Sequence, residues 1–349
     1  MCCDERSAMQ KRCLMAVCLA ALLFVSGCAA LLPDPLQKAE ATIMPGVTAA
    51  LHSPLANENN RDAQTVTLYF RYGREPMLAG ENRVLSVSPN ESAEKALVQA
   101  LLDGPGAGST ELNRLFPDKV QVLNTVSQGE VLYVTFSDAL LRPYADEPND
   151  WQAREDWRRE VKLRRRLAMA GLTASVTENF PYHSVQVLVQ QRSDVSTSLR
   201  LENAYFHDEN MPGGLASPFK REESLLLTQE NTLRTVIAAW QEKDWSRLYL
   251  YVAAYNPFSG QPRPSMDTAF SQWDRAPAVT GYDTTGGSVS HDGFRAVVSA
   301  DLTMVLGGGQ ETSFSTYPVK LFRDRGIWKI PYEQLMALMH LIPGKEAVK

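Results

Sequence analysis

The positions of the cysteines restrict this chain more than any other feature of its sequence. All five, Cys2, Cys3, Cys13, Cys18 and Cys28, lie within the first 28 of its 349 residues. The chain beyond Cys28 therefore has no disulfide, no thiol nucleophile and no cysteine metal site. Its stability has to come from buried apolar cores, and at about 100–200 residues per domain we expect two of them.

The N-terminus has the three zones of an export signal. Two basic residues come first, residues 13–25 form an unbroken apolar run, and Ser26 and Gly27 lead directly into Cys28. A run of this length is too short to span a bilayer and suits a signal-peptide core. The pattern resembles the lipobox of bacterial lipoproteins, which implies cleavage between Gly27 and Cys28 and a lipid on Cys28. An ordinary secretory signal with a chance cysteine is the alternative.

This resemblance implies a signal peptide over residues 1–27 and a mature protein on the extracytoplasmic face of the cell membrane. The formal net charge of the chain is −5, which argues against nucleic acid as a partner. No later segment has about 18 consecutive apolar residues, so the lipid is the only membrane attachment that we expect.

A tether and a first folded unit follow the predicted lipid site. Residues 28–63 combine prolines with a polar cluster and keep neither a helix nor a strand period, which predicts a flexible tether. The first folded unit covers residues 64–206. Its apolar residues alternate over 65–70 as in a strand, and Ser88 and Pro89 predict the start of a helix.

The remaining elements of this unit give its fold class. The helix that starts near position 88 ends before Gly104, and a long charged helix is predicted over about 150–171. Further strands are predicted at 120–126, 131–137 and 185–190. The order of these elements predicts an α+β fold in which helices cover a mainly antiparallel sheet.

Several ordered motifs of this unit resemble the sporulation and spore-germination domain of the GerMN type. The motifs are residues 66–70, 101–105, 134–137, 177–180 and 185–189. The resemblance covers residues 64–206. It implies a small α/β-layer domain and a role in sporulation, germination or a related process of the cell envelope.

The C-terminal part of the sequence predicts a second domain. Residues 207–224 are rich in glycine and proline and predict a linker. Beyond it, two short amphipathic helices are predicted, the second capped by Asp244, and the alternation over 294–306 predicts a strand. Helices followed by a strand meander resemble the nuclear transport factor two-like fold over residues 225–342, an α+β cone with a curved antiparallel sheet. We expect residues 343–349 to form a C-terminal tail.

The helix over 150–171 is the most charged feature of the sequence. Pairs at helical spacing are predicted between Asp150 and Arg154, Glu155 and Arg159, and Glu160 and Arg164. The surplus positive charge predicts a face that docks an acidic partner or anionic headgroups, and a solvated helix face is the alternative. The residues of this possible interaction face are Arg154, Arg158, Lys162 and Arg165.

Two further patterns are candidate sites. Four aromatic residues of the predicted cone could line a pocket or simply pack its core: Trp240, Tyr249, Trp273 and Tyr282. Ser92 and Lys95 match the S-x-x-K pattern of penicillin-binding enzymes, but its companion motifs are missing, which favours a solvated first helical turn. We expect no catalytic residue.

The histidines do not predict a metal site. They are His52, His183, His207, His291 and His340. No two of them have the spacing of metal ligands on a helix or hairpin, so we expect no metal and no cofactor.

Three functions are compatible with the sequence. The favoured one is a membrane-anchored scaffold or interaction lipoprotein with a protein partner in the cell envelope. The second is a ligand-binding lipoprotein that uses a pocket of the cone domain. The third is an envelope enzyme with an unrecognised site. A fold alone does not decide between them.

Overall fold

The computed structural model describes residues 63–341 except for 191–196 and 308. Across these residues, no helix combines the length and apolar character needed to cross a membrane. The predicted signal peptide (1–27), the cleavage and lipidation residues Gly27 and Cys28, the tether up to residue 62 and the tail (343–349) lie outside the described residues.

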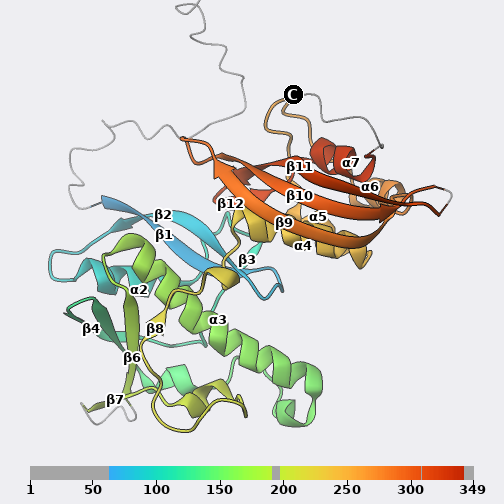
Figure 1. Cartoon of the computed structure of the whole chain (residues 1–349). Helices are drawn as coiled ribbons and strands as arrows, with labels where there is room; N and C mark the ends of the chain where they lie inside the picture. Colours follow the sequence, from blue (N-terminus) through green and yellow to red (C-terminus); the bar gives the residue numbers. More distant parts are fainter. Residues whose placement is uncertain (1–62, 191–196, 308, 342–349) are drawn as a thin grey trace, which may run out of the picture. The chain divides into compact units, whose positions relative to one another are not determined.

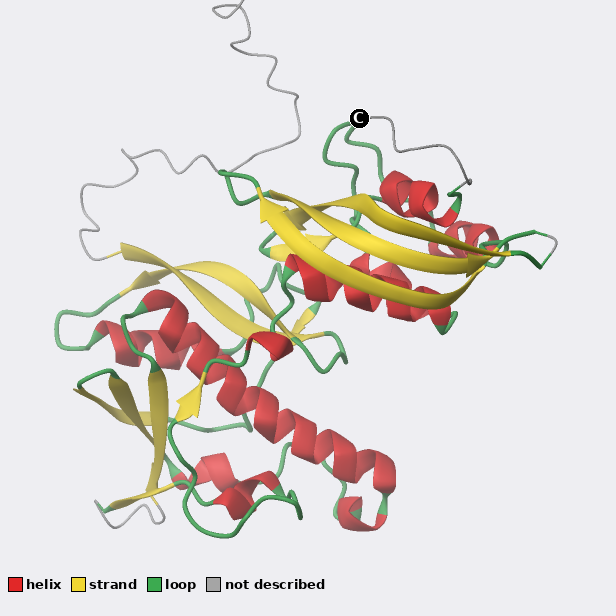
Figure 2. Cartoon of the chain, viewed as in Figure 1, coloured by secondary structure: helices red, strands yellow, loops and turns green. Residues whose placement is uncertain are grey.

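The N-terminal half consists of two sheets and two main helices (Figures 1 and 2). The helices are α2 (Ala93–Asp103) and α3 (Glu155–Asn179). The strands are β1 (Ala63–Tyr72), β2 (Leu78–Ser86), β3 (Leu112–Asn113), β4 (Val122–Gln128), β5 (Val131–Phe136), β6 (Ser184–Gln190), β7 (Ser198–Arg200) and β8 (Phe219–Lys220). This composition confirms the predicted α+β class.

The strands of this half divide between two sheets, whereas the sequence patterns suggested one. The first sheet has the order β2-β1-β3, and the second has the order β4-β5-β6-β7 with β8 also paired to β6. All pairs are antiparallel except β5 and β6, which are parallel because α3 lies between them in the chain. Helices α2 and α3 contact strands of both sheets, so the apolar faces of both sheets are buried against the helices.

Helix α2 starts four residues later than its sequence pattern predicted. The cap is Ser92, whose side-chain oxygen accepts a hydrogen bond from the backbone N–H of Lys95 at 3.2 Å. Ser88 instead lies in a turn before the helix. The Ser92–Lys95 spacing is therefore that of a capping residue and the third residue of its helix.

Replacing Ser92 with alanine should lower the free energy of unfolding by about 1 kcal/mol, because one amide of the first turn of α2 loses its acceptor. Urea unfolding measures this loss. Ser88→Ala is the matched control and should change the stability by much less. Equal effects of the two substitutions would place the start of the helix at Ser88 and contradict the observed cap.

Helix α3 continues well past Gly171, where the sequence pattern suggested its end. Gly171 faces β1, and a methyl group added there would lie 3.1 Å from the carbonyl oxygen of Tyr69 and in collision with Leu115. Near its end, the side chain of Asn179 bonds to both the N–H and the C=O of Thr67 at 2.9 and 2.7 Å. The glycine thus permits a close approach of helix and strand rather than ending the helix.

The C-terminal half is a curled sheet with helices packed along it (Figure 2). The strands follow the order β12-β11-β10-β9, and all pairs are antiparallel. The elements are α4 (Gln229–Gln241), α5 (Trp245–Tyr251), α6 (Met266–Trp273), β9 (Ala278–Val289), β10 (Arg295–Val305), β11 (Glu311–Asp324), β12 (Ile327–Lys329) and α7 (Tyr332–Met339).

Most of this half follows its sequence pattern. Helices α4 and α5 confirm the two predicted amphipathic helices, and the Asp244 side chain accepts from the N–H of Arg247 at 3.0 Å as its cap. Strand β10 alternates as predicted, with Val298, Leu302 and their even-numbered neighbours buried. Helix α6 was not predicted.

All described residues belong to one compact unit. Its two halves share ion pairs and backbone contacts. The guanidinium of Arg247 binds Glu75 with two N–O distances of 2.9 and 3.0 Å, and the Lys329 ammonium binds both oxygens of Glu111 at 2.6 and 2.7 Å. The Tyr72 hydroxyl donates to the backbone oxygen of Leu250.

Candidate functional site

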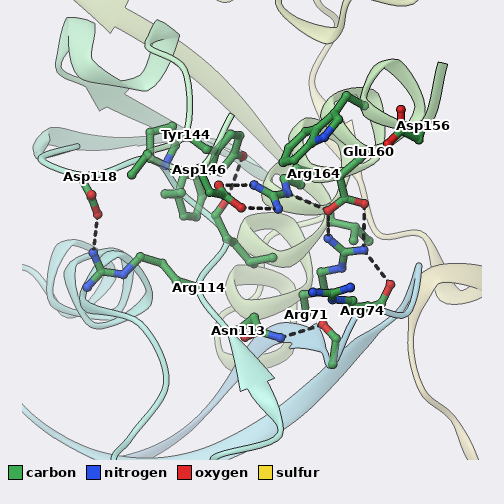
Figure 3. A pocket seen from close by; sticks show the side chains of 17 residues that line it. Arg71, Arg74, Asn113, Arg114, Asp118, Tyr144, Asp146, Asp156, Glu160 and Arg164 are labelled. Carbon is green, nitrogen blue, oxygen red and sulfur yellow. Dashed lines mark hydrogen bonds and ion pairs between the residues drawn. The ribbon is translucent and has the colours of Figure 1, made fainter. Parts of the chain in front are cut away.

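The largest cavity described is an open groove of about 720 Å3 beside the amino end of α3 (Figure 3). Residues from the end of β1, from the segment after β3, from residues 144–146 and from α3 line it. Its charged side chains are Arg71, Arg74, Arg114, Asp118, Asp146, Asp156, Glu160 and Arg164. We call it the arginine groove.

Glu160 is the centre of the charge network in the arginine groove. Its Oε1 accepts from Arg71 at 2.5 Å and from Arg164 at 2.7 Å, and its Oε2 accepts from Arg71 at 3.1 Å. Arg71 also donates to two backbone oxygens nearby. The Glu160–Arg164 contact confirms one predicted helical pair. The Glu155–Arg159 pair is also present, at 3.6 Å.

Arg164 is fixed by ion pairs and by contacts with two aromatic rings. It donates to both carboxylate oxygens of Asp146 at 2.6 and 2.8 Å, and its guanidinium carbon lies 5.4 Å from the ring centres of both Tyr144 and Trp157. Such a two-pronged, stacked geometry is specific to arginine and holds the loop around residue 146 against α3.

The arrangement suits binding better than acid–base catalysis. Burial raises the pKa of Glu160, but the hydrogen bonds from Arg71 and Arg164 outweigh it and leave the pKa below its usual value. The hydrogen bond from Arg164 also lowers the pKa of Asp146. Both groups therefore stay ionised and engaged at neutral pH, and neither is a proton donor. Arg74 lies exposed at the edge, with no ion pair recorded among the described residues.

Because the pKa values of Glu160 and Asp146 are lowered, the stability of the fold depends on pH. A carboxylate whose folded pKa is depressed stabilises the fold above its unfolded pKa and loses this contribution as the pH falls through the folded value. We expect the urea midpoint to drop as the pH is lowered from about 5 to about 3. The Glu160→Gln/Asp146→Asn variant should be less stable than the wild type at pH 7, and its stability should fall less on acidification. A drop as steep as that of the wild type would contradict the assignment.

The predicted interaction face is only partly exposed. Arg154 and Arg158 are exposed, and Arg154 pairs with Asp156 rather than with Asp150. Lys162 is half-buried, 3.6 Å from Asp208. Arg165 is buried, with 3% of its surface exposed. The structure thus brings Arg154 and Arg158 to the surface and directs Arg165 into the protein.

The four aromatic residues of the predicted pocket lie in or beside the core of the C-terminal half. Trp240 and Trp273 are fully buried, and the Trp240 indole donates to the oxygen of Pro277 at 3.0 Å. Tyr249 and Tyr282 are half-buried against the same core. Tyr249 and Trp273 contact each other at 6.2 Å between ring centres. None of these four aromatic residues lines the arginine groove.

Sequence reasoning missed Arg71 and Asp146 as members of the site. Arg71 meets Glu160 from 89 positions away in the chain, and Asp146 meets Arg164 from 18 positions away. Helical spacing signals only the local pair. No local pattern marks the partners that come from a strand and a loop.

One protein-family model matches the chain. It is the Germane family, described as "Sporulation and spore germination", and it matches residues 67–194. Residues 67–194 therefore resemble a GerMN-type domain, in agreement with the motifs. This segment includes α2, α3 and strands of both sheets, as well as every lining residue of the arginine groove.

The solved structures resemble the chain only weakly. The tandem GerMN domains of the sporulation protein GerM from Bacillus subtilis are 14% identical, with a TM-score of 0.32 over 50% of this chain. The match spans about half (51%) of that structure. A SEC-C motif containing protein from Rhodopseudomonas palustris is 22% identical, with a TM-score of 0.24 over 29% of this chain and 73% of that one. A comparison with curated proteins found no match.

Proposed function

We propose that the chain is a lipid-anchored, non-catalytic interaction protein on the extracytoplasmic face of the cell membrane, acting in sporulation, spore germination or a related envelope assembly. The observation that carries this proposal is the Germane match over residues 67–194. The N-terminal pattern that ends in Gly27 and Cys28 supports the anchor. The ionised, mutually bound side chains of the arginine groove support a binding role.

The docking surface of this proposal is the exposed edge of the arginine groove together with the start of α3. Arg74 and Arg158 lie there without an ion pair among the described residues, and Arg154 lies four positions before Arg158 in the sequence. Exposed guanidinium groups bind carboxylates in a planar, two-pronged way. The partner is therefore a protein with an acidic surface. The C-terminal half, which we assign to the nuclear transport factor two-like cones from its helices on a curled sheet, is a second part of the scaffold.

The anchor is tested by replacing Cys28 with serine in the producing cell. The wild type should incorporate labelled palmitate and sediment with membranes, and the Cys28→Ser protein should do neither. Sedimentation of the unlabelled variant with membranes would overturn the anchor. The scaffold role is separate, because it predicts an acidic partner whether or not the anchor is present.

The docking surface is tested by charge reversal of its exposed arginines. Arg74→Glu/Arg158→Glu should abolish cross-linking of the anchored protein to its envelope partner, because two attractive contacts become repulsive. Arg234→Glu on α4, another exposed arginine, is the matched control and should leave cross-linking unchanged. Undiminished cross-linking of the double variant would exclude this surface.

A further inference from the structure

The buried guanidinium of Arg165 is the least satisfied charged group that the structure describes. Its Nε has no hydrogen-bond partner, and its ion pair with Glu147 is long, at 3.9 Å. The partner atom, Oε1 of Glu147, also lacks a hydrogen bond. The two side chains are only 4% and 1% exposed. An arginine carries five donors, and buried polar groups are almost always hydrogen-bonded. A buried Arg165 with an unbonded Nε is therefore unusual and leaves a donor for a ligand.

A cavity of about 260 Å3 adjoins this guanidinium, and Arg165 is one of its lining residues. The cavity is separate from the arginine groove. It lies between α3, the β6–β7 pair and the 3-10 helix Asn203–Phe206. Glu147 is not among its lining residues.

The rest of the lining combines aliphatic walls with two exposed charged residues, Arg200 and Glu202. The aliphatic walls are Leu141, Val189, Leu199 and Leu201. The ring of Tyr205 packs on the guanidinium at 4.9 Å and fixes its plane. His207 is also a lining residue, and partial burial, followed by the charge of Arg165, lowers the pKa of its imidazole. His207 is therefore neutral at neutral pH, so Arg165 is the buried cation of the cavity and Arg200 is an exposed one.

We propose that this cavity binds a small carboxylate with a short apolar tail. The planar carboxylate accepts from the free donors of Arg165, and the tail fills the aliphatic walls. A cavity of roughly 150 Å3 holds a benzene ring, so this one has room for a ring or a short chain with its carboxylate. Glu202 in the lining and Glu147 beside Arg165 disfavour anions of higher charge such as phosphate, because repulsion grows with the charge brought close to them.

Binding is measured by calorimetric titration of the full chain with benzoate and with hexanoate, and benzamide serves as the neutral analogue of benzoate. We expect the full chain to prefer benzoate over benzamide by roughly tenfold or more, because a hydrogen bond to a charged group is stronger than one to a neutral group. Equal affinities for the two, or no binding of either carboxylate at concentrations on the order of 10 mM, would overturn the proposal.

Variants at the wall separate recognition from folding. Leu199 lines the cavity and is 47% exposed, so its replacement does not disturb the core. Leu199→Glu should weaken benzoate binding at least tenfold more than Leu199→Gln does, because the two new side chains have similar shapes and only glutamate repels the carboxylate of the ligand. The Arg165→Met/Glu147→Gln variant removes both buried charges together and should lose the preference for benzoate while remaining folded by circular dichroism. A retained preference in that folded variant would exclude Arg165 as the binding group.

Discussion

Glu111→Gln should destabilise the protein by about 3–5 kcal/mol, which is the typical result when one partner of a buried ion pair is removed. The remaining partner, Lys329, has a side chain that is only 3% exposed, and its ammonium has Glu111 as its ion-pair partner at 2.6 Å. After the substitution, the buried ammonium of Lys329 has neither a counter-charge nor bulk water around it. Urea unfolding at pH 7 measures the loss.

The pH dependence of this loss identifies its cause. Burial lowers the pKa of Lys329, and Glu111 offsets only part of that shift. Without Glu111 the pKa falls further, so the folded variant binds fewer protons than the unfolded chain and becomes more stable as the pH rises. The loss of unfolding free energy caused by Glu111→Gln should therefore become smaller in alkaline buffer. A deficit that stays constant with pH would show that the buried charge is not responsible.

The reverse substitution is the matched control. Lys329→Met leaves Glu111, whose side chain is 26% exposed and stays in contact with water. It should cost about 1 kcal/mol or less, because an apolar side chain of similar length replaces the ammonium in the core. Equal losses for the two substitutions would contradict the difference in burial on which the argument depends.

Local signals predicted most of the elements of this fold, and non-local pairing decided their arrangement. The cap at Asp244 and the alternation of β10 need only neighbouring residues, and both are confirmed. The parallel pairing of β5 with β6 and the division of the strands into two sheets depend on residues far apart in sequence. No period of 2 or 3.6 residues carries that information.

The end of α3 and the burial of Arg165 show two different reasons for error. Gly171, and the serine and threonine residues after it, are weak helix formers, and the packing of the helix against β1 overrides this weakness. Arg165 has the charge of a surface residue but lies four positions after Val161 and three before Ala168, both of which are buried. Its place on that apolar stripe was a readable signal, and the charge obscured it.

Gly326→Ala should cost about 3 kcal/mol or more. Gly326 lies in the turn between β11 and β12 at a φ of +91°, which disfavours any residue with a Cβ. The added methyl group would also lie 2.5 Å from the carbonyl oxygen of Gly80 in β2. Since the obstacle is backbone, relief requires the turn and β2 to move apart. The nearby contacts of Glu111 with Lys329 and of Arg325 with the Gly108 oxygen would loosen with them.

The Gly293→Ala variant separates the cost of a positive φ from the cost of the contact with β2. Gly293 has a similar φ of +73° in the turn between β9 and β10, but a methyl group there would have open space around it. This variant carries the conformational cost alone and should lose about 1 kcal/mol. The excess loss of Gly326→Ala over Gly293→Ala, measured by urea unfolding, therefore reports the contact between the turn and β2. Equal losses would mean that the C-terminal sheet does not press on β2 in solution, and the ion pair of Glu111 would then lose the packing that keeps water away from it.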